Sequence, residues 1–114
     1  MTEYNKFMTQ EQLGIILGQL RTGLSRLLGP QMQAVYLYGS QARGDARPDS
    51  DIDILVVLNG DFNYFGMIEK TGELAANLSL EHDTVISLAF TRKDNFEHQR
   101  IPFLMNIRHE GIAI

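Results

Sequence analysis

Between residues 10 and 28 the apolar side chains recur at intervals of three and four, as they do on the buried face of a helix. These positions are Leu13, Ile16, Leu17, Leu20, Leu24, Leu27 and Leu28. Gly29 and Pro30 follow directly, and such a pair is expected to end a helix. The spacing therefore predicts a helix over residues 10–28 that packs against a core.

Shorter apolar runs predict β-strands. The first strand is expected over residues 33–38. Residues 52–58 are apolar on both faces, which indicates an interior strand that is covered on both sides. A third strand is predicted over residues 83–90, and Ile112-Ala113-Ile114 is expected to add a short edge strand.

Helical spacing returns between the later strands. Residues 62–78 are predicted to form a helix, after a turn at Asn59-Gly60-Asp61. Residues 93–108 are predicted to be helical with a break near Pro102. The order helix, strand, strand, helix, strand, helix describes an α/β (α+β) chain, and we expect one domain over residues 1–114.

Composition and charge limit the cellular compartment and the classes of binding partner that we expect for this chain. The chain has no Cys, which excludes a disulfide framework and a thiolate metal site. We find no secretory leader pattern and no apolar run of about 20 residues, so we expect a cytoplasmic protein that does not enter a membrane. The net charge is −4 and the ten Lys and Arg residues are scattered. Because nucleic-acid polymers bind clustered basic residues, no direct nucleic-acid binding is expected.

A Gly-Ser pair at the end of the first predicted strand is a candidate phosphate site. Gly39 has no Cβ, so a phosphate can approach its backbone closely. The free amides of a short helix after the strand, together with its dipole, favour an anion. Ser40 can donate to a phosphate oxygen, and Arg43 can meet further negative charge. On its own, however, a Gly-Ser pair is more often simply a turn.

Asp51 and Asp53 at the start of the second predicted strand are a candidate metal site. Residues two apart in a strand point to the same side, so both carboxylates are expected on one face. Mg²⁺ prefers such oxygen ligands and keeps positions for water and phosphate. Two like charges about 4 Å apart repel by about 4 kcal/mol at an effective dielectric of 20, and a cation relieves this repulsion. The alternative is a solvated Asp-rich loop, which we favour for Asp45 and Asp49.

Asp83 is the candidate third carboxylate, because it opens the next predicted strand as Asp53 opens its own. If the two strands are neighbours, Asp83 would bind the metal or accept a proton from an attacking hydroxyl. The alternative is a surface Asp that begins a strand. His82, His98 and His109 lack the spacing of a metal-ligand set, and only His82 adjoins a candidate residue.

The stretch that contains these residues resembles a known family. Gly39-Ser40, ten further residues and then Asp51-Ile52-Asp53 match the signature of the DNA polymerase β-like nucleotidyltransferases. The fuller string over residues 38–44 and 50–53 resembles the minimal nucleotidyltransferases, which are similar to the antitoxin partners of HEPN-domain toxins. The resemblance covers nearly the whole chain, with departures at Gln41 and His82.

This resemblance implies a mixed sheet flanked by helices and a role for each candidate residue. Gly39 and Ser40, with Arg43 beside them, would hold the phosphates of ATP. The three carboxylates would bind Mg²⁺ as a triad; they are Asp51, Asp53 and Asp83.

The implied reaction is the transfer of AMP from ATP to an acceptor hydroxyl, with release of pyrophosphate. Because little chain is left once this core is placed, we expect the acceptor to lie on a partner protein, a cognate HEPN-type toxin that is silenced by the transfer. A homo- or hetero-oligomer is compatible with this expectation. Two alternatives stay open. In the first, the chain neutralises the toxin by contact alone. In the second, it acts on a small molecule, as an aminoglycoside nucleotidyltransferase does.

Overall fold

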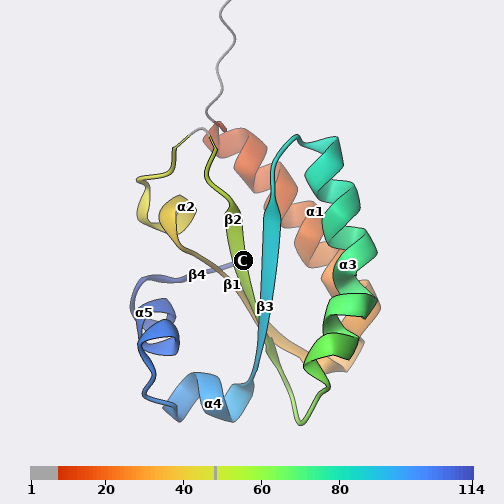
Figure 1. The fold of residues 1–114 in the computed structure, drawn as a ribbon, viewed down its shortest axis with the longest axis vertical. Coiled ribbons are helices and arrows are strands. Elements are labelled where there is room, and N and C mark those ends of the chain that lie inside the picture. Colours follow the sequence, from red (N-terminus) through yellow and green to blue (C-terminus); the bar gives the residue numbers. More distant parts are fainter. Residues whose placement is uncertain (1–7, 48) are drawn as a thin grey trace, which may run out of the picture.

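The computed structural model describes residues 8–47 and 49–114, and it shows a four-stranded sheet between two pairs of helices (Figure 1). The strands are β1 (Met32–Tyr38), β2 (Ile52–Leu58), β3 (Ile86–Arg92) and β4 (Ile112–Ala113). Their order in the sheet is β3-β2-β1-β4. β2 runs parallel to β3, whereas β1 is antiparallel to both β2 and β4. The predicted mixed sheet flanked by helices is thus confirmed.

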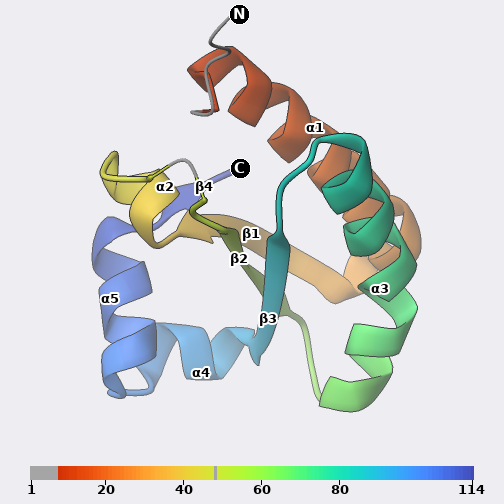
Figure 2. The same ribbon diagram turned by 45° about the horizontal axis from the view of Figure 1, so that its top comes forward.

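The helices cover both faces of this sheet (Figure 2). α1 (Gln10–Leu28) and α3 (Tyr64–Glu81) pack on one face, and α4 (Lys93–His98) and α5 (Pro102–Glu110) pack on the other. A 3₁₀ turn, η1 (Gly29–Gln31), precedes β1, and the one-turn helix α2 (Ser40–Arg43) follows it. None of the helices in the described ranges is long and apolar enough to pass through a membrane.

β2 is the centre of the core, because it has a strand on each side and helices on each face. Its apolar residues Ile52, Ile54, Leu55, Val56, Val57 and Leu58 are each at most 1% exposed. This double burial explains the unbroken apolar run and confirms the predicted interior strand. Asp53 interrupts the run and is only partly buried, so β2 holds it firmly while its carboxylate stays accessible.

Local signals set the ends of the helices. α1 begins with a capping box, in which the Thr9 hydroxyl accepts from the Gln12 amide at 3.0 Å and the Gln12 side chain accepts from the Thr9 amide at 2.9 Å. α3 begins after Asn63, whose side chain accepts from the Gly66 amide at 2.7 Å. The predicted helix over residues 10–28 is confirmed, and Pro102 divides the predicted helix 93–108 into α4 and α5.

Three expectations need a correction or reach beyond the structure. The helix predicted over 62–78 spans Tyr64–Glu81, and the strand predicted over 83–90 spans Ile86–Arg92. The single domain predicted over residues 1–114 includes positions 1–7 and 48, which lie outside the described residues.

Candidate active site

The Gly-Ser turn and the Asp pair meet at the end of the sheet where β1 finishes and β2 starts. Antiparallel pairing sets Tyr38, the last residue of β1, opposite Asp53. A Cβ on Gly39 would lie only 2.4 Å from the Asp53 Oδ2 atom. The two segments therefore touch, and the contact depends on the absence of a side chain at position 39.

Gly39 also has a backbone conformation that other residues avoid. Its φ of 74° and ψ of −157° lie in a region that is essentially restricted to glycine. Its carbonyl accepts from the Ala42 and Arg43 amides, each at 3.1 Å, and this begins α2. Gly44, with a φ of 83°, ends that helix. The short helix predicted after the first strand is thus confirmed, and it lies between Gly39 and Gly44.

Asp51 lies close enough to Asp53 for its negative charge to act on that carboxyl group. Asp51 immediately precedes β2 and is exposed, whereas Asp53 is partly buried. The pKa of Asp53 is raised, first by burial and then by the negative charge of Asp51, while Arg43 acts in the opposite direction. Two hard carboxylate oxygen donors that repel one another are a donor set that suits Mg²⁺.

Arg43 connects this site to the end of α5. Its Nε lies 3.3 Å from the Asp45 Oδ2 atom, and its Nη1 lies 3.6 Å from the Glu110 Oε1 atom. Exposed ion pairs of this kind add little to stability, so they hold the guanidinium only loosely. A phosphate near Gly39 would compete for it easily.

Tyr38 lies between the site and α5. Burial, and then the neighbouring Asp53 charge, raise the pKa of Tyr38 to about 12. Its ring meets Phe103 edge-on at 5.4 Å, and Tyr36 stacks on Phe96 at 4.9 Å. Both tyrosines therefore pack against aromatic side chains of α4 and α5.

Asp83 is not the first residue of β3, because α3 continues to Glu81 and β3 begins at Ile86. Asp83 lies in the intervening turn and has a left-handed backbone with a φ of 50°. Its predicted position at the strand start is therefore wrong. The helix ends at a residue that can turn the chain, and apolar spacing alone does not show where that happens.

The residue that does lie beside Asp53 on β3 is Ser87. The parallel register pairs Ile52 with Ile86 and Asp53 with Ser87. Within residues 8–47 and 49–114, no three His, Cys, Asp or Glu side chains form a group that could hold a metal ion. The sequence did not indicate Ser87, because its place beside Asp53 depends on the order of the strands. The one sequence feature that could have indicated it is that Asp53 and Ser87 are each the second residue of their strand.

His82 has partners of its own. Its Nε2 lies 2.7 Å from the Gln19 Oε1 atom and 3.2 Å from the Glu81 Oε2 atom. It therefore ties the end of α3 to α1, as a structural residue does.

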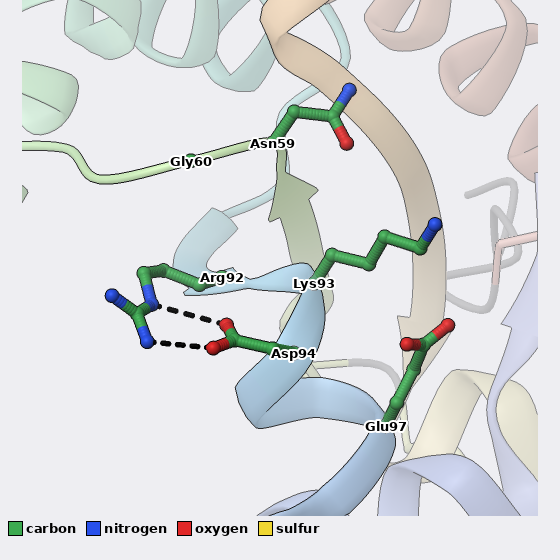
Figure 3. Close-up of a pocket in the computed structure, with 6 residues that line it drawn as sticks. All are labelled: Asn59, Gly60, Arg92, Lys93, Asp94 and Glu97. Carbon is green, nitrogen blue, oxygen red and sulfur yellow. Dashed lines mark hydrogen bonds and ion pairs between the residues drawn. The ribbon is translucent and has the colours of Figure 1, made fainter.

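A hollow lies at the other end of the sheet from Asp53, where β2 and β3 finish. Figure 3 shows the side chains around it. The residues that line it are Asn59, Gly60, Arg92, Lys93, Asp94 and Glu97. The Arg92 guanidinium is already paired with Asp94 at 2.7 Å and with Asp61. Because this cation is neutralised within the chain, we assign the hollow no ligand.

Comparison with known proteins places this sequence in one protein family. Residues 17–102 match the nucleotidyltransferase domain. A Methanocaldococcus jannaschii protein that bears the name "putative protein adenylyltransferase" is 30% identical over 87% of this chain and 95% of its own length.

Solved structures show the same fold. A chain of a toxin–antitoxin complex with AMP-PNP matches with a TM-score of 0.58 and 23% identity, over 82% of this chain and 68% of the other. A chain of a mutant MntA–HpeT toxin–antitoxin complex matches with a TM-score of 0.55 and 20% identity, over 82% and 67%. At such identities the likeness concerns the fold alone.

Proposed function

Since this chain belongs to the nucleotidyltransferase domain family, we propose that it is a Mg²⁺-dependent protein adenylyltransferase. It transfers AMP from ATP to a hydroxyl of a HEPN-type toxin and so neutralises that toxin. The observation that carries the proposal is the contact between Gly39 and the Asp53 carboxylate. It unites a phosphate-type turn and a carboxylate pair in one site.

The phosphates of ATP bind at the turn between β1 and α2. The glycine at position 39 lets a phosphate oxygen approach the backbone, and the Ser40 amide and hydroxyl supply donors. Arg43 leaves its weak pairs with Asp45 and Glu110 to neutralise phosphate charge. These residues set the position of the nucleotide relative to Asp53.

Asp51 and Asp53 would hold the Mg²⁺ ion. When bound, the ion neutralises negative charge on the phosphates and on the carboxylate pair. The pair is suited to this because Asp53 is fixed within the buried β2 strand, while Asp51 precedes the strand and is exposed.

The transfer exchanges one phosphorus–oxygen bond for another. The acceptor oxygen forms a bond to the α-phosphorus, and the bond from that phosphorus to the bridging oxygen breaks. Pyrophosphate leaves with the electron pair, and the hydroxyl proton passes to solvent. The residues of this chain contribute by orienting the nucleotide and balancing charge, which are large terms in phosphoryl chemistry.

The choice of a protein acceptor rests on the similar proteins. The M. jannaschii relative is named for protein adenylylation. Chains of the same fold occur in toxin–antitoxin complexes, one of which contains AMP-PNP. Exposure of Asp51 agrees with this choice, because a hydroxyl on another macromolecule can then reach the site.

Intact-mass measurement tests the proposal. The chain and its co-purifying partner are incubated with Mg²⁺ and each of the four nucleoside triphosphates. We expect one or more AMP additions to the partner with ATP, lost with EDTA or in D53N and retained in the matched loop variant D49N. If no nucleotide is added while the partner stays bound, the chain acts by contact alone and the transferase proposal is wrong.

A further inference from the structure

On the basis of the proposed function, we propose that Ser87 occupies the third position beside the metal-binding carboxylates. Asp83 then has only a structural task, which is to end α3. The site contains two carboxylates and one neutral hydroxyl, and it binds a single divalent cation.

The way in which α3 ends is enough to account for an Asp at position 83. Its own amide donates to the Leu80 carbonyl at 3.4 Å, and the Thr84 amide donates to the Ser79 carbonyl at 3.0 Å. These two bonds around a residue with a φ of 50° form a Schellman motif. Glycine is commonest at that position, and Asp and Asn are among the few other residues that adopt it readily. Asp83 thus satisfies the helix end without any ligand.

Ser87 is placed by the ladder between β2 and β3. Tyr38, Asp53 and Ser87 form one row across three adjacent strands. Directly paired residues of neighbouring strands lie about 4.8 Å apart and point to the same side of the sheet. Ser87 is partly buried, and its side chain lies on the face that carries Asp53. It is therefore the β3 residue best placed to reach a ligand of Asp53.

Charge balance favours a single cation. Asp51 and Asp53 carry two negative charges, which one divalent ion neutralises. A carboxylate at position 87 would add a third negative charge beside Asp53, whereas the Ser87 hydroxyl offers an oxygen ligand or a hydrogen bond with no charge. The absence of a three-carboxylate group from the described segments agrees with this assignment.

Counting bound Mn²⁺ by electron paramagnetic resonance tests the inference on the full chain. We expect one Mn²⁺ per chain, displaced by Mg²⁺ and lost in D53N. S87A should weaken binding about tenfold, as loss of a supporting group at a metal site does. S87D should tighten binding about tenfold or admit a second ion, because ligand charge sets affinity at such sites.

Position 83 supplies the matched controls. D83N keeps a residue that tolerates positive φ, so it should leave Mn²⁺ affinity unchanged within about twofold. D83G should be at least as resistant to urea as the parent chain, since glycine suits this conformation best. Circular dichroism of each variant verifies folding before the metal is counted.

The outcomes separate this inference from the function on which it rests. If D83N loses Mn²⁺ as D53N does, or if S87A and S87D both bind like the parent chain, the assignment of Ser87 is wrong while the metal site stands. Two Mn²⁺ ions in the parent chain would also contradict it. If the parent chain binds neither Mn²⁺ nor AMP-PNP, the proposed function fails together with the inference.

Discussion

Replacing Gly39 by Ala perturbs the site at its most restrictive point. The new methyl group would lie 2.4 Å from the Asp53 Oδ2 atom, and the backbone would keep a φ of 74° and a ψ of −157°. Two costs therefore combine, one from the backbone and one from the displaced carboxylate.

Both costs can be estimated. A residue other than glycine in this region of φ and ψ costs about 1–3 kcal/mol. Ordinary contact begins at 3.4 Å, so the carboxylate must move by about 1 Å (3.4 − 2.4) or the turn must shift. A displacement of about 1 Å at reacting groups can lower a rate by about a hundredfold. G39A should therefore lose about 1–3 kcal/mol of unfolding free energy and about a hundredfold in AMP transfer.

Gly44 provides the control. Its φ is 83°, but a Cβ there would meet nothing within 4 Å. G44A should cost about 1–2 kcal/mol in backbone strain alone and keep its affinity for AMP-PNP. Urea denaturation gives the stabilities, and calorimetric titration with AMP-PNP gives the affinities.

A double-mutant cycle separates the two costs. D53A removes the carboxylate that the new methyl group would strike, so G39A should cost less in the D53A background, by about 1 kcal/mol. If G39A behaves like G44A in both assays, or if the cycle shows no coupling, the contact between Gly39 and Asp53 does not constrain the site.

Further predictions concern charge near the turn. D53N should stabilise the metal-free chain at pH 7 by about 0.5–1 kcal/mol, because it removes a partly buried charge beside Asp51. Because the pKa of Asp53 is higher in the fold than in the unfolded chain, the fold favours its protonated form more than the unfolded chain does. The stability that comes from this difference is present below the unfolded pKa and is lost as pH rises through the folded pKa. The urea midpoints of D53N and the parent chain should therefore converge at about pH 3, and a D53N variant that is less stable at pH 7 would contradict this. The pKa of Tyr38 is raised from 10.0 to about 12, so the unfolding free energy should fall as pH rises from 10 to 12. Y38F should remove the share of this fall that comes from Tyr38, and identical alkaline profiles of Y38F and the parent chain would contradict the prediction. R43M should leave the urea midpoint unchanged, because the ion pairs of Arg43 are exposed, yet it should weaken AMP-PNP binding. R26M on α1 should alter neither property, and equal AMP-PNP affinities of R43M and the parent chain would exclude Arg43 from the site.

The residues around the turn were predictable because their geometry is local. Gly39 and Ser40 end one apolar run, and Asp51 and Asp53 begin another, so the sequence itself shows where strand and turn meet. The double burial of β2 was predictable too, since its apolar run is unbroken after Asp53. What no local pattern indicated was the direct contact across the turn.

Position 83 shows where such reasoning stops. An Asp before an apolar run resembles a strand start, but here it is the left-handed residue that ends α3. Which β3 residue pairs with Asp53 depends on strand order and register, and these follow from the packing of the whole sheet. Ser87 could therefore be recognised only in three dimensions.

Labelling the partner with ATP that is radioactive at either the α- or the γ-phosphorus tests the central claim most directly. Nucleotidyl transfer at the site of Gly39, Asp51 and Asp53 predicts that the partner takes up the α-label and none of the γ-label, and that D53N abolishes this uptake. Uptake of the γ-label, or an α-label that persists in D53N, would contradict the account.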